Sequence, residues 1–269
     1  MDVSFGQYYP ANSFVHKCDP RVKLLFLVMY IVLIFVAKNF YALLTCAAVF
    51  VVVAVCSGVP IKTLLRSTKT ILFLLIFTAL INLFFYDGET VLFSFWIITI
   101  TKEAVIHTVF LGTRLILLVL GSALLTLTTT PVALTDGIES LFSPLKIIHF
   151  PVHELALVMS IALRFIPILT DETTRIMNAQ KARGADFETG SLFSRVKAVV
   201  PILIPLLIGA FRRADELGDA MDARCYSGSK VRTKYKKLQL GKRDVVVICF
   251  AVLFLTASIL MRIFLPVII

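Results

Sequence analysis

The sequence predicts an all-α, polytopic membrane protein. Of its 269 residues, 58% are hydrophobic and 16% are charged, whereas a soluble domain is about half apolar and a quarter charged. The apolar excess is gathered into long runs, and about 20 such residues can cross a bilayer as a helix. Basic residues flank these runs. The net charge of +10 is therefore typical of the cytoplasmic loops of a membrane protein.

Five apolar runs predict transmembrane helices, two of them with the help of flanking residues. They are Val22–Val36, Phe40–Val59, Ile71–Tyr86, Ala104–Leu127 and Val245–Ile269. Lys and Arg collect before the first run, between the second and third, and in the long stretch before the fifth. Since cytoplasmic loops are rich in these residues, we expect the N-terminus inside the cell and the C-terminus outside.

The spans predict three parts of the chain. Residues 1–130 form an N-terminal membrane domain with four spans, residues 131–241 a cytoplasmic or interfacial domain, and residues 242–269 a last transmembrane helix. In the first part, the β-prone stretch that follows Asp87 and contains Trp96 predicts a small hairpin or an interfacial segment on the outside.

The middle part has helical patterns of its own. Pro131 begins a short amphipathic helix that we expect to run to about Phe142. A second helix is expected over Val152–Ala182 and a third from about Ser191 to Tyr226, with kinks or breaks at their internal prolines.

Each of the two longer helices is apolar first and polar afterwards. The apolar halves, Leu155–Leu169 and Val199–Phe211, are short for a transmembrane helix. We interpret them as helices that lie along the membrane surface or beneath a partner. A sixth and a seventh span are the alternative.

Two short sequence echoes, 41 residues apart, close these helices. They are Ala179–Gly184 and Ala220–Cys225, and both read Ala-x-x-Ala-Arg-small. Alanines three residues apart share a helix face and let a partner approach, while the arginine can bind a carboxylate through two N–H groups. An arginine near a helix C-terminus can also simply complement the helix dipole. Two matching tips favour docking to two similar partners, with Gly184 as a C-cap.

Other charged residues have plainer interpretations. Those before each tip are expected to form a solvated helix face with pairs such as Arg212–Glu216, and ion pairs between the two helices are the alternative. Arg114, inside an apolar run, is a functional candidate by its position, although packing or a contact with a partner subunit explains it equally well. Arg164, close to Pro167, is expected to orient its helix.

The sequence lacks the signatures of catalysis and of cofactor binding. No Gly-x-x-x-x-Gly-Lys-Ser/Thr loop occurs, so we do not expect this chain to bind ATP through a P-loop. His149 and His153 have a spacing found in metal sites, but Pro151 interrupts the helix and Glu154 is the one further ligand nearby. We therefore predict no metal and no cofactor. Basic residues without interleaved aromatics argue against nucleic acid as a partner.

These features resemble the transmembrane T component of energy-coupling factor (ECF) transporters over essentially the whole chain. The resemblance rests above all on the two Ala-Arg tips, and also on Asp19-Pro20-Arg21, Thr101-Lys102-Glu103 and Arg164-Phe165-Ile166-Pro167. It implies two crossing cytoplasmic coupling helices, each docking into one of two ABC-type ATPase subunits, alike or in a heterodimer. The docking residues it implies are Ala182, Arg183 and Gly184 at one tip and Ala223, Arg224 and Cys225 at the other. The family pattern usually has glycine at both tips, so we expect the helix end at Cys225 to differ in geometry without loss of docking.

The resemblance also implies a function. ATP-driven closure of the ATPases would move the two helices, and a membrane-embedded, substrate-binding S component above their apolar halves would topple and release a vitamin or another micronutrient inside a bacterial cell. The chain itself would be a non-catalytic scaffold in the plasma membrane, surrounded by lipid. The alternative is a self-sufficient permease or channel, although the spans offer few polar groups besides Arg114. A membrane enzyme is disfavoured by the missing acid–base and metal sets.

Overall fold

The computed structural model describes residues 8–69, 71–85, 90–95, 98–148, 150–185, 192–226 and 241–264. Within these residues all regular secondary structure is helical apart from one two-stranded hairpin, which confirms the predicted all-α class. The chain divides into two compact units. Unit 1 comprises Met1–Leu141 and Leu238–Ile269, and unit 2 comprises Phe142–Lys237.

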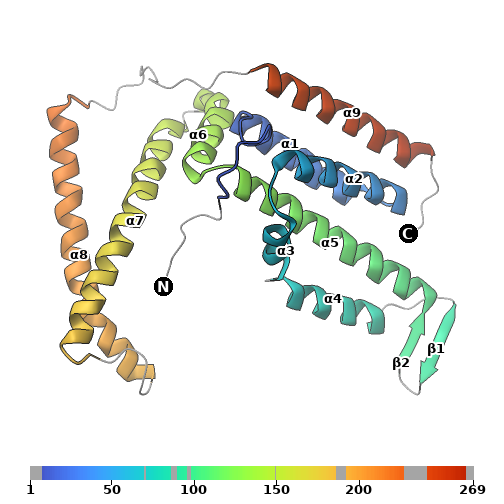
Figure 1. Cartoon of the computed structure of the whole chain (residues 1–269), viewed down its shortest axis with the longest axis horizontal. Helices are drawn as coiled ribbons and strands as arrows, with labels where there is room; N and C mark the ends of the chain where they lie inside the picture. Colours follow the sequence, from blue (N-terminus) through green and yellow to red (C-terminus); the bar gives the residue numbers. More distant parts are fainter. Residues whose placement is uncertain are drawn as a thin grey trace. The chain divides into compact units, whose positions relative to one another are not determined.

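Unit 1 packs its helices around two clusters of buried apolar side chains. Its helices are α1 (Pro20–Val36), α2 (Phe40–Ser57), α3 (Ile61–Lys69), α4 (Leu72–Phe85), α5 (Lys102–Thr128), α6 (Pro131–Phe142, which ends at the unit boundary) and α9 (Lys242–Phe264). Helices α1, α2, α5 and α9 lie side by side (Figure 1), and the core residues Ile34, Leu43, Phe110 and Phe254 come one from each. The end of α6 at Phe142 confirms the predicted boundary. Helix α3 occupies the basic stretch between the second and third predicted spans, for which the sequence predicts a loop.

The hairpin consists of β1 (Val91–Phe95) and β2 (Ile98–Thr101), which pair antiparallel with Phe95 opposite Ile98. It lies beside the ends of α4 and α5 (Figure 1). The small hairpin is thus confirmed, while Trp96 lies outside the described residues.

Four helices of the described chain are long and apolar enough to cross a membrane, by length and composition, and these are α2, α5, α7 (Val152–Ala182) and α9. The protein is thus a multi-pass membrane protein. The first and third predicted spans are helical but shorter, with 17 residues in α1 and 14 in α4. By this criterion of length and composition α7 joins the candidate spans, because the helix is continuous and its apolar window of 18 residues is longer than the apolar half Leu155–Leu169. The far ends of the third and fifth predicted spans, at 86 and 265–269, lie outside the described residues.

Two buried aspartates join the starts of α1 and α9. The Asp19 carboxylate caps α1 by accepting a hydrogen bond from the backbone N–H of Arg21 at 2.9 Å. The backbone N–H of Asp19 donates to Oδ1 of Asp244 at 2.7 Å, and Oδ2 of Asp244 accepts from the N–H of Gly241 at 2.8 Å. The Asp244 carboxylate therefore links the start of α9 to the residue that precedes α1.

Two cations in unit 1 bind carbonyl groups at helix ends. Arg114 donates from Nη2 to the carbonyl of Ala37, just after α1, at 2.6 Å, and its guanidinium lies 4.8 Å from the centre of the Phe110 ring. The Lys23 ammonium donates to the carbonyl of Thr128, the last residue of α5, at 3.1 Å. Cations satisfy carbonyls left unpaired at helix C-termini. Of the accounts open for Arg114, the structure supports packing within the chain.

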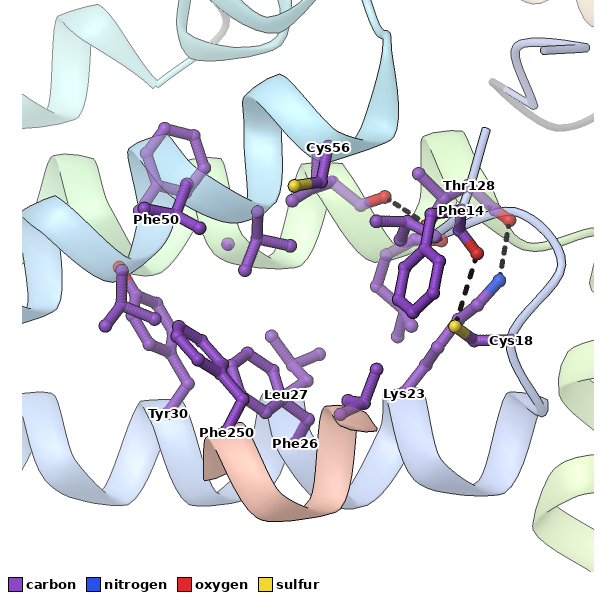
Figure 2. Close-up of a pocket in the computed structure, with 18 of the residues that line it drawn as sticks. Phe14, Cys18, Lys23, Phe26, Leu27, Tyr30, Phe50, Cys56, Thr128 and Phe250 are labelled. Carbon is purple, nitrogen blue, oxygen red and sulfur yellow. Dashed lines mark hydrogen bonds between the residues drawn. The ribbon is translucent and has the colours of Figure 1, made fainter. Parts of the chain in front are cut away.

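Figure 2 shows an apolar cavity of about 240 Å³ between the segment before α1 and helices α1, α2, α5 and α9. Lys23 and Thr128 close one end of it, and Tyr30 and Phe50 lie at the other. Gly121 of α5 also lines the cavity, against the ring of Tyr30.

We expect Gly121→Ala to destabilise unit 1. A Cβ at Gly121 would lie 2.7 Å from Cε1 of Tyr30, whose ring is buried and whose hydroxyl donates to the carbonyl of Cys46 at 3.4 Å. Overpacking of this kind lowers the free energy of unfolding by about 1–3 kcal/mol. Thermal unfolding of the purified protein in detergent measures the change.

The same helix offers a matched control in Gly112. A Cβ there would meet no atom within 4 Å, so Gly112→Ala is expected to be neutral or to stabilise α5 by about 0.5–1 kcal/mol through the loss of backbone freedom in the unfolded chain. Equal losses of stability in both variants would contradict the close contact between α1 and α5.

Unit 2 contains, in its described part, the 3₁₀ helix η1 (Ser143–Ile148) and the long helices α7 (Val152–Ala182) and α8 (Leu192–Ala223). The bounds of α7 are those predicted, and α8 begins and ends within three residues of the prediction. Both helices continue through Pro167, Pro201 and Pro205, so no break occurs. Helices α7 and α8 contact each other and cross (Figure 1).

Candidate functional site

Helices α7 and α8 end in the same backbone motif. At the first tip, the N–H of Gly184 donates to the carbonyl of Lys181 and that of Ala185 to the carbonyl of Gln180, both at 3.0 Å. At the second tip, the N–H of Cys225 donates to the carbonyl of Asp222 at 2.8 Å and that of Tyr226 to the carbonyl of Met221 at 3.0 Å. This pair of bonds defines a Schellman motif.

The two tips therefore share one geometry, and our expectation of a different helix end at Cys225 is wrong. Gly184 has φ +87° and Cys225 has φ +57°, so both residues adopt the left-handed conformation that terminates a helix. Cys225 is the one non-glycine residue with positive φ in the part of the chain that the structure describes. The backbone motif persists because its hydrogen bonds compensate for the unfavourable conformation of a residue with a side chain.

We expect Cys225→Gly to stabilise the second tip, because glycine adopts the left-handed conformation without steric cost. The opposite exchange, Gly184→Cys, should destabilise the first tip although its Cβ would meet no atom within 4 Å. Each change is expected to alter the free energy of unfolding by about 1 kcal/mol in opposite directions. Thermal unfolding of both variants measures this, and the same direction of change in both would contradict the shared geometry.

Every predicted docking residue is exposed. This holds for Ala182, Arg183 and Gly184 at the first tip and for Ala223, Arg224 and Cys225 at the second. The structure brings the three residues of each tip together, and it places the two tips at separate ends of the α7–α8 pair (Figure 1). The unit thus presents two separate, exposed helix tips with one backbone geometry.

An ion pair connects the two helices where they cross. Nη1 of Arg213 on α8 contacts Oε2 of Glu172 on α7. The Arg213 side chain is 30% exposed and the Glu172 side chain 27%. Gly209 of α8 lies beside the same carboxylate, since a Cβ there would be 3.3 Å from Oε1 of Glu172. Of the two accounts left open for these charges, a pairing between the helices is confirmed for Glu172 and Arg213. The sequence offered no signal that selected these two residues from the charged face.

Thr101 and Glu103, which also carried the resemblance, make contacts that hold the fold of unit 1. Thr101 caps α5 by accepting from the N–H of Ala104 at 3.3 Å, and Glu103 accepts from the hydroxyl of Thr90 at 2.6 Å, which fastens the hairpin to α5. Arg164 is exposed on the apolar half of α7. His149 and the basic stretch at 230–237 lie outside the described residues.

The five cysteines differ in access. Cys18 and Cys46 are buried, whereas Cys225 is exposed at the second tip. Burial, and secondly the nearby carboxylate of Asp244, raise the pKa of the Cys18 thiol. Because the thiolate is the reactive form, Cys18 should react slowly. Cys56 and Cys249 are exposed but lie on α2 and α9, two of the candidate spans. Cys225 is thus the natural thiol probe of unit 2.

Fold and helix ends together define a multi-pass membrane protein that presents two like, arginine-bearing tips. The family model CbiQ, described as cobalt transport protein, matches residues 11–235. The chain is 46% identical over 261 residues to the energy-coupling factor transporter transmembrane protein EcfT of Ruminiclostridium cellulolyticum, with 97% of each chain covered. It is 45% identical over 263 residues to EcfT of Clostridium kluyveri, again with 97% of each covered. The chain belongs to this family, the transmembrane EcfT components of ECF transporters.

Proposed function

We propose that this chain is the energy-coupling scaffold of an ECF-type importer for vitamins or other micronutrients. It would transmit the ATP-driven motion of two ATPase subunits to a substrate-binding S component, and it would carry out no catalysis itself. The observation that carries the proposal is the pair of exposed Ala-Arg tips with one shared helix-end geometry. Like tips suit like partners, and the two ATPase subunits of an ABC-type pair, identical or in a heterodimer, are such partners.

Each tip combines a small alanine with an exposed arginine, which suits insertion into a groove of a partner. The alanines Ala182 and Ala223 add little bulk, so a groove on the partner can close around the helix end. The guanidinium groups of Arg183 and Arg224 then meet the groove, and a carboxylate there can accept two parallel hydrogen bonds from each. The residues that we propose for docking are Ala182, Arg183, Gly184, Ala223, Arg224 and Cys225.

The apolar halves of α7 and α8 supply the surface proposed for the S component. Their large apolar side chains are exposed on unit 2, and include Leu155, Val158, Met159, Val199, Leu203, Ile204, Leu207, Ile208 and Phe211. Exposed apolar patches of this extent mark surfaces that contact protein or membrane. An S component embedded in the membrane could cover them while the polar tips stay in water.

The proposal fixes an orientation in a bacterial plasma membrane. The N-terminus and the tips of α7 and α8 would face the cytoplasm, where ATP is found, and the C-terminus would face outward. The middle region at 131–241 would then be the coupling domain, between a membrane domain at 1–130 and the last transmembrane helix at 242–269. The excess of Lys and Arg in the loops assigned to the inside supports this orientation.

A thiol footprint tests docking and orientation together. Cys225 should react with a membrane-impermeant maleimide in inside-out vesicles and not in right-side-out vesicles, and the ATPase subunits should protect it. The double variant Cys225→Gly with Gly184→Cys moves the thiol to the first tip in the same backbone conformation. Protection at both positions is expected, and free labelling of either tip in the assembled complex would contradict docking there.

Co-purification separates the scaffold from its alternative. The tagged chain, solubilised in mild detergent, should bring down two ATPase subunits and a small membrane protein that mass spectrometry can identify. A self-sufficient permease or channel should instead mediate uptake when it is reconstituted alone in vesicles. Uptake by the isolated chain without ATP would overturn the proposed function.

A further inference from the structure

The sequence echo extends from the tips to the point where the helices cross. Arg183 and Arg224 are 41 residues apart, and so are Glu172 and Arg213, the partners of the ion pair. Each partner precedes the arginine of its own tip by the same number of residues. The ion pair therefore joins equivalent positions of the two helices, one carrying a negative charge and the other a positive charge.

Equal spacing gives the two helices polar segments of equal length beyond the crossing. Ala182 is the last residue of α7 and follows Glu172 by ten residues, and Ala223 is the last residue of α8 and follows Arg213 by ten. At about 1.5 Å per residue, each segment measures about 15 Å from the ion pair to the helix end. The two residues of the ion pair are thus equally far along their helices from the two tips.

The contact at the crossing suits rotation better than sliding. Because Gly209 has no side chain, α8 presents no Cβ that would press against the carboxylate of Glu172 as the helices turn. A single charge pair keeps its contact when the helices turn about it. A slide of one helical turn, about 5.4 Å, would separate the charges.

We propose that Glu172 and Arg213 form a pivot: they are positioning residues that hold the crossing point of α7 and α8 while the angle between the helices changes. The proposal rests on the proposed function, because the angle matters only if partners bound at the tips move. In that case, the pivot converts a change in the distance between the two ATPase subunits into a change of angle in the apolar halves of the same helices.

Charge reversal and charge exchange in the complete transporter test the pivot. Glu172→Arg places two arginines at the crossing, and Arg213→Glu places two carboxylates there. We expect either variant to assemble with the ATPases and to hydrolyse ATP, while uptake falls about tenfold or more because like charges repel at the contact. The double variant Glu172→Arg with Arg213→Glu restores an opposite pair and should recover uptake to within about threefold of the unaltered transporter.

Neighbouring residues provide controls with the same change of charge. Asp171→Arg and Arg212→Glu alter exposed residues that directly precede Glu172 and Arg213. These two residues are also 41 positions apart, so they occupy equivalent positions on the two helices. They should leave uptake near its normal rate. Loss of uptake in these controls equal to that in the pivot variants would show a general effect of charge and would overturn the proposal.

A distance measurement adds a readout that does not depend on transport. Spin labels at Asn178→Cys and Asp219→Cys, in a background in which the exposed native cysteines are replaced, report the separation of the polar segments in the complete transporter. We expect the single reversals to broaden the distance distribution and the double exchange to narrow it again. An unchanged distribution in the single variants, or no recovery in the double exchange, would overturn the pivot. Failure of the ATPases to bind the unaltered chain would instead overturn the proposed function.

Discussion

Replacement of Arg183 or Arg224 by glutamate is expected to abolish ATP-driven uptake. Both side chains are exposed at the tips of α7 and α8, so the change should leave the fold of unit 2 intact. In an acidic groove, the new carboxylate would remove a two-fold hydrogen bond and add repulsion, at a cost of about 2–5 kcal/mol. That energy corresponds to an affinity loss of about thirtyfold to several thousandfold at the altered tip.

Uptake of labelled substrate into cells or vesicles measures the effect, and co-purification shows whether it arises from lost docking. Arg175→Glu is the control, since Arg175 is exposed on the polar half of α7 and lies two helical turns before the tip. Normal uptake and intact assembly in the double variant Arg183→Glu with Arg224→Glu would refute docking through the arginines.

Removal of the Asp244 carboxylate should have the largest effect on stability. Asp244 is 4% exposed and accepts from two backbone N–H groups, those of Asp19 at 2.7 Å and Gly241 at 2.8 Å. Asp244→Ala leaves the buried N–H of Asp19 without this acceptor, at a cost of about 1–3 kcal/mol. It also removes the contact with the N–H of exposed Gly241, which caps the start of α9 and is worth about 0.5–2 kcal/mol. We expect a loss of about 2–5 kcal/mol in the free energy of unfolding, which is large for a protein of marginal stability.

The midpoint of thermal unfolding and the yield of folded protein in detergent measure this loss of stability. Asp244→Asn keeps one oxygen acceptor and should lose less stability than Asp244→Ala. Asp219→Ala, at an exposed position on α8, should alter the midpoint little. A midpoint for Asp244→Ala equal to that of Asp219→Ala would show that the aspartate does not join α1 to α9.

Helix bounds in unit 2 were predictable because local signals fix them. The apolar-then-polar pattern that ends at Gly184 marks α7, and in unit 1 Pro131 and the polar pattern before Phe142 mark α6 in the same way. The exposed tips followed from the same reasoning, since their residues repeat in sequence. The continuity of α7 and α8 through their prolines did not follow, because local rules count the lost hydrogen bond and omit the surrounding contacts.

Contacts between distant residues could not be predicted from the sequence alone. Asp19 and Asp244 are separated by 225 positions, and no periodicity links them. The same holds for Arg114, whose partner, the carbonyl of Ala37, is 77 positions away. Every residue has a backbone carbonyl, so the residue types do not indicate which carbonyl accepts the hydrogen bond. The ion pair between Glu172 and Arg213 was hidden among several charges of both signs, and only the crossing of the helices selects it.

The link between Asp19 and Asp244 also has a consequence for biosynthesis. Unit 1 is built from both ends of the sequence, with unit 2 between them. At about 5–20 residues per second, a ribosome needs about 10–45 seconds to travel from Asp19 to Asp244, which are 225 positions apart. During this interval α1 is made and the acceptor for the Asp19 N–H is not. The two long helices of unit 2 are thus synthesised before unit 1 can close, and partner subunits could bind them on the nascent chain.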